Sequence, residues 1–248
     1  LSAAEKANML FIVQDPYTSY YDAKVVRDFV ALTQKLGFEP IILPFKPNGK
    51  AMHIKGFLTR FSKTAKTQAE FLNRVAKLNV PLVGVDPAIV LSYRDEYKEA
   101  LGDSRGDFHV LTAHEWLTNQ LESNALQSAV KNIAKSDRTF EWHLFPHCTE
   151  STFMPNSPKE WQHIFAQFGQ TKKVEKVGCC GMAGVFGHEV QNQTMSKEIY
   201  DVSWGKKLQG KDPNHCLATG YSCRSQVKRY EKAILKHPVQ ALLEVLNN

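Results

Sequence analysis

Five cysteines lie in the second half of this 248-residue sequence, and the first 147 residues contain none. They are Cys148, the adjacent pair Cys179 and Cys180, Cys216 and Cys223. An odd number of cysteines argues against a framework of disulfides. Two adjacent thiols are also poorly placed to form an unstrained disulfide with each other. We therefore expect these thiols to serve one local site.

Each group of thiols follows a predicted strand. The strands are expected over residues 140–145, 172–178 and 215–218. Cys148 follows the first strand, Cys179 and Cys180 follow the second, and Cys223 lies shortly after the third. Functional groups of parallel α/β sheets collect beyond the carboxyl ends of the strands. We therefore expect these thiols to meet at one edge of one sheet.

Thiolates that converge in this way repel one another, so the site needs a positive counter-charge. An iron–sulfur cluster or a zinc ion would supply that charge and hold the cysteines deprotonated. The glycines of the cysteine turn fit a metal site because they permit positive φ and let backbone N–H groups approach sulfur closely. These glycines are Gly178, Gly181, Gly184 and Gly187. The alternative is that the cysteines are small buried hydrophobic residues and the glycines only shape a turn.

The elements that must position this site alternate between strand and helix. In the first half, strands are expected over 9–13, 39–45, 80–85 and 108–112, and helices over 22–37, 57–78, 92–101, 113–121 and 124–136. In the second half, helices are expected over 157–169, 196–209 and 222–235, the first of them capped by Ser157. This alternation predicts an α/β protein with parallel sheets and helices on both faces.

The order of elements recurs after residue 138, which indicates a divergent internal repeat. The segment that contains Pro16 aligns roughly with the segment that contains Pro146. We therefore expect two Rossmann-like halves, residues 1–125 without cysteines and residues 126–248 with the metal site. If the repeat is real, only one half has kept a site.

Several segments of the second half resemble the cysteine-rich CCG domain of iron–sulfur oxidoreductases. The resemblance is carried by PHCTE, GCCGMAGVFGHE and LATGYSCRSQVKR, and the ending KHPVQALLEVL extends it. Together these segments are similar to the C-terminal part of long bacterial FAD-linked oxidases that act on D-2-hydroxy acids. The resemblance covers nearly the whole chain, but its distinctive motifs lie within residues 140–247.

The resemblance implies that Cys148, Cys179, Cys180 and Cys223 are the ligands of an iron–sulfur cluster, with [4Fe–4S] as the expected type. Gly220 departs from the family pattern, which has the first cysteine of Cys-x-x-Cys at this position. Without that fifth ligand, the noncubane clusters of some family members are not expected. Cys216 is a less favoured substitute ligand, and we expect it to be an inert thiol inside a strand. The first half would be a degenerate CCG-like unit.

Two histidines flank the thiols. His147 and His188 would form hydrogen bonds to a cluster sulfur, act as a mixed ligand or donate a proton, or they are loop histidines bonded to backbone. Of the two, we assign His188 together with Gly178, Gly181 and Gly184 to the surroundings of the cofactor. Arg224 would steer an anionic substrate or offset the cluster charge, although an exposed helix position is preferred for it. Glu150 and Glu189 are interpreted as ordinary acids of a first helical turn.

Composition and missing motifs exclude several functions. No apolar run reaches the roughly 18 residues of a membrane-spanning helix. The net charge of +6 is spread along the chain without interleaved aromatic residues, so nucleic-acid binding is not expected. No GxGxxG, Walker, HExxH or GxSxG motif occurs. Because the start LSAAEKANMLFIV reads as a cut inside a longer chain, we expect FAD to bind a part of the parent chain outside this sequence.

Three functions are therefore weighed. The preferred one is an oxidoreductase fragment that relays electrons from flavin to a quinone or carrier, beside FAD-binding and ferredoxin-like modules of the same parent chain. The alternative is a zinc-binding module that staples the domain or docks a partner and has no redox role. A thiol-dependent reductase that uses a Cys179–Cys180 pair ranks last. We expect a cytoplasmic location, with a peripheral position at the inner membrane as the variant.

Overall fold

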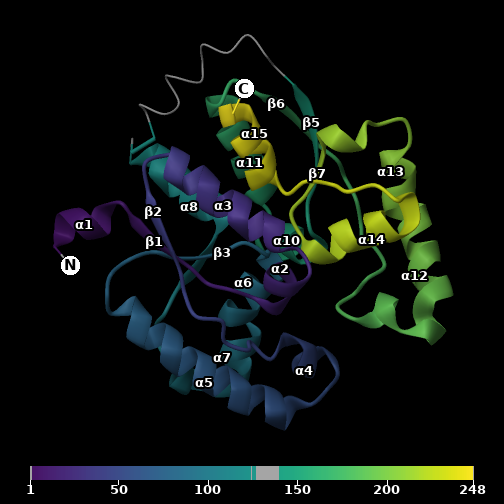
Figure 1. Cartoon of the computed structure of the whole chain (residues 1–248). Helices are drawn as coiled ribbons and strands as arrows, with labels where there is room; N and C mark the ends of the chain where they lie inside the picture. The colour runs from purple at the N-terminus through teal and green to yellow at the C-terminus, as the bar shows by residue number, and fades with distance from the viewer. Residues whose placement is uncertain (1, 124, 127–139, 248) are drawn as a thin grey trace. The chain divides into compact units, whose positions relative to one another are not determined.

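The chain, described here by a computed structural model over residues 2–123, 125–126 and 140–247, divides into two compact units (Figure 1). The units are Leu1–Ala129 and Val130–Asn248. Each contains a parallel sheet with helices, which confirms the predicted α/β class with two Rossmann-like halves. The helix predicted over 124–136 lies, except for residues 125 and 126, outside the described residues.

The first unit has a four-stranded sheet in the order β2-β1-β3-β4, and all its pairs are parallel. The strands are β1 (Met9–Ile12), β2 (Glu39–Ile42), β3 (Leu82–Gly84) and β4 (Val110–Thr112). Its helices are α1 (Ala3–Ala7), α2 (Pro16–Tyr20), α3 (Ala23–Lys35), α4 (Lys50–Ile54), α5 (Leu58–Ala76), α6 (Pro87–Arg94), α7 (Glu96–Leu101) and α8 (Ala113–Glu122). The single helix predicted over 92–101 is instead two helices, because α6 starts at Pro87 behind its cap Asp86 and ends before Asp95.

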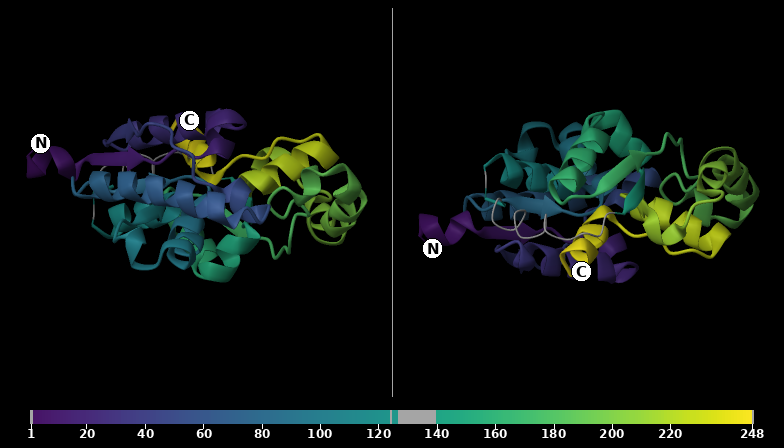
Figure 2. Two further views of the ribbon diagram at one scale, coloured as in Figure 1. Left: turned by 90° about the horizontal axis from the view of Figure 1, so that it is seen from below. Right: turned by 90° about the horizontal axis from the view of Figure 1, so that it is seen from above.

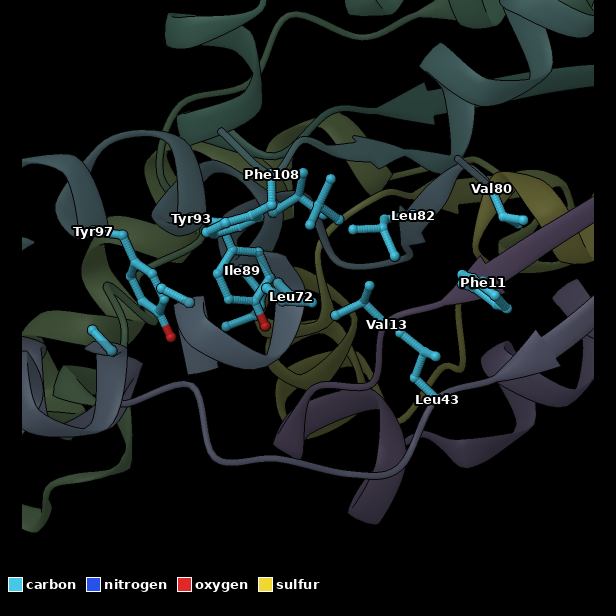
Figure 3. Close-up of a cluster of buried hydrophobic side chains, with 14 of the residues drawn as sticks. Phe11, Val13, Leu43, Leu72, Val80, Leu82, Ile89, Tyr93, Tyr97 and Phe108 are labelled. Carbon is cyan, nitrogen blue, oxygen red and sulfur yellow. The ribbon is translucent and has the colours of Figure 1, made fainter. Parts of the chain in front are cut away.

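The central strand β1 is buried on both faces, as is usual for parallel strands, whereas the edge strand β2 is largely exposed. Met9, Phe11 and Val13 alternate along β1 with Leu10 and Ile12, and all five side chains are buried. The first three pack into a cluster with side chains of α5, α6 and α7, part of which Figure 3 shows. The cluster also contains Leu43, Phe61, Ala65, Ala69, Leu72, Val80, Leu82, Ile89, Val90, Tyr93, Tyr97, Phe108 and Val110.

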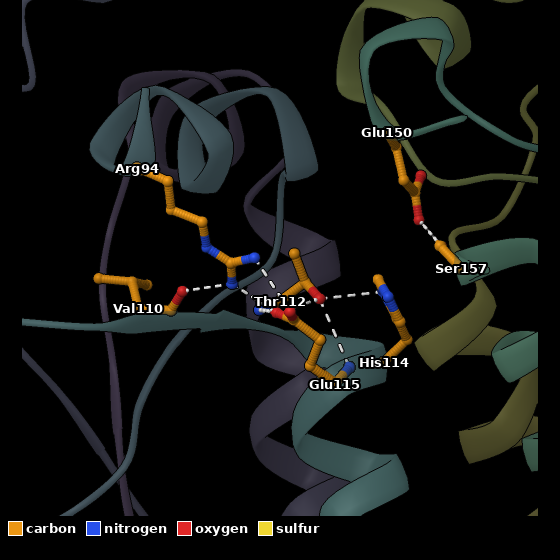
Figure 4. A network of polar contacts seen from close by, with 7 residues as sticks. All are labelled: Arg94, Val110, Thr112, His114, Glu115, Glu150 and Ser157. Carbon is orange, nitrogen blue, oxygen red and sulfur yellow. Dashed lines mark hydrogen bonds and ion pairs between the residues drawn. The ribbon is translucent and has the colours of Figure 1, made fainter. Parts of the chain in front are cut away.

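A polar network joins the end of α6 to β4 and the start of α8. The Arg94 guanidinium donates to both carboxylate oxygens of Glu115, at 2.9 and 2.5 Å, and to the Val110 carbonyl at 2.7 Å (Figure 4). Glu115 also accepts the Thr112 N–H at 2.8 Å, which closes a capping box at the start of α8. The paired fork geometry makes this a specific contact between elements far apart in sequence.

The second unit has a three-stranded parallel sheet in the order β6-β5-β7. The strands are β5 (Glu141–Phe145), β6 (Thr171–Val174) and β7 (Cys216–Ala218). Its helices are α10 (Cys148–Phe153), α11 (Ser157–Gln167), α12 (Gln193–Tyr200), α13 (Lys206–Leu208), α14 (Tyr221–Glu231) and α15 (Pro238–Asn247), and a π-helical turn over Asp201–Gly205 joins α12 to α13. Helices α12 and α14, green and yellow in Figures 1 and 2, lie side by side.

Ser157 is not the cap that the sequence predicts for α11. It occupies the first helical position, and the N-cap residue Asn156 makes no side-chain capping bond. The Ser157 hydroxyl is buried and donates instead to Glu150 (Figure 4).

Candidate functional site

The cysteines follow the three strands of the second sheet. Cys148 is the first residue of α10 after β5, Cys179 and Cys180 lie in the loop after β6, and Cys223 lies in the first turn of α14 after β7. Because the three strands are parallel neighbours, their carboxyl ends lie at one edge of the sheet. The strand order places β5 between the other two, so Cys148 comes from the central strand.

The side chains of these four cysteines interact in a chain. Cys179 acts on the pKa of Cys148 and of Cys180, and Cys223 acts on the pKa of the same two thiols, so the four side chains lie close together. None of the five cysteines forms a disulfide. Sulfur atoms from positions 148 to 223 therefore meet at one place.

Charge is distributed unevenly over this chain of thiols. Hydrogen bonds from Cys148 and Cys180, together with the backbone N–H groups of Gly181 and Ala183, hold the pKa of Cys179 far below its usual range. The Gly181 N–H lies 3.3 Å from the Cys179 sulfur. The hydrogen bond to Cys179 and burial raise the pKa of Cys148, and hydrogen bonds to Cys179 and Cys223 raise that of Cys180. The site thus stabilises a thiolate at Cys179 first.

Cys216 packs in the same buried cluster as Cys180 and Cys223, but no other cysteine shifts its pKa. It is fully buried in β7, and its side chain packs in the core of the second unit. Burial raises the pKa of Cys216 to about 11, and the nearby charges that modify this pKa come from Lys211, Asp212 and Glu175 rather than from another cysteine.

The cysteine turn is held by contacts that no sequence motif indicates. Gln226 of α14 donates to the Cys180 carbonyl at 3.0 Å and to the Ser196 hydroxyl at 2.9 Å. Ser196 of α12 in turn donates to the Gly181 carbonyl at 2.7 Å. Both polar side chains are fully buried, so each bond is made in a low-dielectric interior. Two helices therefore fix the backbone of the turn.

Gly181 is required by two features of this turn. Its φ is +82°, a left-handed conformation, and a Cβ added there would lie 2.1 Å from the Ser196 carbonyl oxygen. Gly184 also has a positive φ of +70°. Gly178 does not; its N–H donates to Ser203 at 2.7 Å, and its carbonyl accepts the Trp204 indole N–H at 3.1 Å. The expectation of positive φ thus holds for Gly181 and Gly184 but is wrong for Gly178 and Gly187.

A second buried network joins the ends of β5 and β7. The Thr219 hydroxyl donates to Glu150 and accepts the backbone N–H of His147 at 2.9 Å. Glu150 lies in the first turn of α10, as the sequence predicts, but it is 1% exposed and also accepts from Ser157, so it belongs to a buried network. The sequence offers no local signal for this role, because Glu150 and Thr219 lie on different strand–helix units.

His147 caps α10 and fills the space beside Gly220. Its Nδ1 accepts the Thr149 N–H at 3.2 Å, and its Nε2 lies 3.2 Å from the Ser222 hydroxyl. A Cβ at Gly220 would lie 2.3 Å from the imidazole ring. The histidine ring therefore occupies the space of a side chain at 220, which accounts physically for a glycine where the family pattern has a cysteine.

His188 and Arg224 lie in different surroundings. His188 is exposed on the cysteine loop, and partial burial and Arg229 lower its pKa. Arg224 is 5% exposed, so the preferred prediction of an exposed helix residue is wrong. Its guanidinium donates to the carbonyls of Ala218 and Thr219 at 2.9 and 3.0 Å. Arg224 thus fixes the backbone at the carboxyl end of β7, just before the first turn of α14, which carries Cys223.

The arrangement of thiols bears on which metal group fits. Among the described residues, no three Cys, His, Asp or Glu side chains surround one point as ligands of a single ion. Structural zinc needs four ligands around one point. A four-iron cluster takes one thiolate at each iron, so its ligands need not share a point. Four thiols that lie close together, with the Gly181 N–H directed at the Cys179 sulfur, have the donor chemistry of an iron–sulfur cluster, and four thiolates are also a ligand set for zinc.

Lys172 is a buried cation in the same unit. Its ammonium lies 5.8 and 5.3 Å from the ring centroids of Trp161 and Phe165, and the residue is 5% exposed. Burial lowers the pKa of Lys172 to about 6, against the opposing effect of Glu150. Because the unfolded value is about 10.4, the unfolded chain binds more protons between these values, and stability from this site rises with pH.

We therefore expect Lys172→Met to raise the free energy of unfolding at pH 7 by about 1–3 kcal/mol. The gain should shrink toward pH 10, where the unfolded lysine also loses its proton. Urea unfolding at pH 7 and at pH 9 measures both values. Lys173→Met, at the exposed neighbouring position of β6, is the matched control and should change little. A loss of stability in Lys172→Met, or a gain independent of pH, contradicts the assignment.

Fold and site together define an α/β chain with a four-thiol centre at the carboxyl edge of its second sheet. No protein-family model matches the chain.

Curated relatives of the chain share one name. This chain is 81% identical over 246 residues to the D-2-hydroxyglutarate dehydrogenase of Haemophilus influenzae. It is 57% identical over 246 residues to the enzyme of that name from Escherichia coli and 39% identical over 244 residues to the one from Pseudomonas putida. These matches cover 99%, 99% and 98% of this chain but 24%, 23% and 23% of the relatives. The chain thus spans about a quarter of the length of the curated relatives it matches, and those relatives are oxidoreductases.

Proposed function

We propose that this chain is the iron–sulfur electron-transfer part of a FAD-linked D-2-hydroxy acid dehydrogenase. The observation that carries the proposal is the meeting of Cys148, Cys179, Cys180 and Cys223 at one sheet edge. The relatives named D-2-hydroxyglutarate dehydrogenase support the reaction class and point to a 2-hydroxy diacid as substrate of the parent enzyme. The C-terminal position in that parent is part of the same proposal.

In this proposal the four thiolates hold a [4Fe–4S] cluster, which accepts and passes on single electrons when bound. The N–H groups of Gly181 and Ala183 stabilise negative charge on the Cys179 sulfur. Ser196 and Gln226 keep the turn in place by bonding to its carbonyls. Gly178, Gly184 and His188 line the surroundings of the cluster.

The parent enzyme supplies the remaining parts. FAD belongs to a FAD-binding module and takes the electrons of the substrate, and a ferredoxin-like module lies beside it in the same chain. A quinone or a carrier receives the electrons. No helix within the described residues is long and apolar enough to cross a bilayer. We place the enzyme in the cytoplasm, with contact to the inner membrane where the acceptor is a quinone.

Metal analysis of the anaerobically purified chain tests the proposal. We expect a brown protein with broad visible absorption and about four iron and four labile sulfide per chain. A colourless protein that binds one zinc ion tightly would overturn the electron-transfer role and establish a structural zinc site instead. A folded chain without any bound metal would also overturn it.

A further inference from the structure

A pocket of 520 Å³ opens in the second unit, on the side of α13 and the end of α14 (Figure 1). Residues from 201–213 and from 227–233 line it, so every lining residue belongs to this unit. The π-helical turn Asp201–Gly205 begins and ends on lining residues, and π-helical turns are rare and frequent at functional sites. The volume suits a small organic ligand, because ligand pockets measure about 300–1,000 Å³.

The wall of this pocket is part of the core that holds the thiols. Val227 lines the pocket and belongs to the buried cluster that also contains Cys180 and Cys223. Leu208 and Ala233 line the pocket as well and pack against the same cluster. A ligand in the pocket would therefore rest on the side chains that surround the proposed metal centre. An electron acceptor requires such proximity, because electron transfer slows steeply with distance.

Tyr200 places a buried hydroxyl between the pocket and the thiols. The residue is fully buried, and its hydroxyl has no hydrogen-bond partner among the described residues. A Cβ added to Gly205, which lines the pocket, would lie 3.5 Å from the Tyr200 ring. Burial raises the pKa of Tyr200, and the charges of Glu231, Asp201 and Cys180 raise it further. Two of these charges belong to the lining and the third to the thiol centre, so the hydroxyl has the pocket on one side and the thiols on the other.

The mouth of the pocket carries exposed aliphatic side chains. Val202 and Ile234 are 68% and 73% exposed, and each adjoins a lining residue in the sequence. The lining itself contains two acidic and two basic residues, Asp201, Glu231, Lys206 and Lys211. Charges of both signs disfavour a ligand of strong net charge, such as a nucleotide or a diacid, because each meets like charge. An uncharged polar head with an apolar tail fits this lining and this mouth.

We propose that the pocket binds a quinone with an apolar tail as the electron acceptor, with the Tyr200 hydroxyl donating to a ring carbonyl oxygen and the tail lying along Val202 and Ile234. The inference rests on the proposed electron-transfer function and names its acceptor. It selects a quinone over a carrier protein, because a protein docks on a surface whereas a small molecule fills a pocket.

The exchange of electrons balances. Oxidation of the C2 hydroxyl of a 2-hydroxy acid to a ketone releases two electrons and two protons. The quinone takes up two electrons, which reach it through the redox groups of the parent enzyme, and two protons from solvent. The products are a 2-oxo acid and a quinol.

Titration of the full 248-residue chain with decylubiquinone tests the pocket without any need for iron. Trp204 lies in the π-helical turn at the pocket, so the bound quinone should quench its fluorescence. We expect Tyr200→Phe to weaken binding about three- to tenfold, the effect of one lost hydrogen bond. Its melting temperature should not fall, because the hydroxyl that it removes has no partner in the free protein. A tyrosine with a purely structural role would show the opposite pattern.

Ala233→Leu fills the pocket from its wall and should abolish the quenching. Ala166→Leu, at an exposed position of α11, is the matched control and should bind like the wild type. Circular dichroism of each variant shows that it is folded. In the iron-loaded chain, decylubiquinone added without air to the reduced protein should restore the oxidised visible spectrum, with two chains oxidised per quinone.

The outcomes separate this inference from the proposed function. A brown chain that does not bind the quinone, or undiminished binding in both Tyr200→Phe and Ala233→Leu, would overturn the inference and leave the electron-transfer function standing. A colourless chain that binds the quinone at this pocket would support the ligand site and overturn the electron-transfer function.

Discussion

Replacing Cys180 with serine is expected to abolish iron binding, whereas replacing Cys216 with serine should leave it intact. Cys180 is the buried centre of the thiol chain and interacts with both Cys179 and Cys223. A serine oxygen is a poor substitute for a thiolate as a ligand of cluster iron. Cys216 makes no contact of this kind, since its shifted pKa traces to burial and to charged neighbours. Iron and sulfide per chain, together with visible absorption, measure the difference.

Both substitutions place a hydroxyl in a buried position, so each is expected to cost about 1–3 kcal/mol of stability. Circular dichroism of both variants shows whether they remain folded at the temperature of the assay. The comparison is decisive when both variants fold. Full iron content in Cys180→Ser would show that Cys180 is not a ligand. Loss of iron in Cys216→Ser would show that Cys216 is one. Zinc content measured on the same samples identifies a zinc site by the same pattern.

Replacing Gly181 with alanine is expected to cost about 2–4 kcal/mol of unfolding free energy and to release the bound iron. The residue has φ +82°, and the new Cβ would lie 2.1 Å from the Ser196 carbonyl oxygen. That oxygen belongs to the backbone of α12, so it cannot move away cheaply. The displaced turn would carry Cys179 and Cys180 with it, because the Gly181 N–H bonds to the Cys179 sulfur.

Gly210→Ala is the matched control for this prediction. Gly210 has a similar φ of +73°, and nothing lies within 4 Å of its added Cβ. It should therefore cost only the backbone strain of a left-handed alanine, about 1–2 kcal/mol, and should retain iron. Urea unfolding of the two variants, followed by circular dichroism under identical conditions, gives the comparison. Equal costs for both would show that the close approach to Ser196 does not contribute.

Much of this architecture is determined by local sequence. Buried apolar runs such as Met9–Ile12 and the periodic apolar face of Ala23–Lys35 predict β1 and α3 from residues close together in the chain. Strand–helix alternation then requires parallel sheets, and parallel sheets bring strand ends to one edge. For that reason the amino-acid sequence alone suffices to assign the cysteines after three predicted strands to one place.

Only the tertiary structure decided which side chains meet at that edge. The order β6-β5-β7 brings Thr219 to Glu150, and packing buries Arg224 against strand-end carbonyls. Periodicity reports only whether a residue is buried within its own element. Partners across elements depend on strand order and register, which arise from long-range packing that no local pattern encodes.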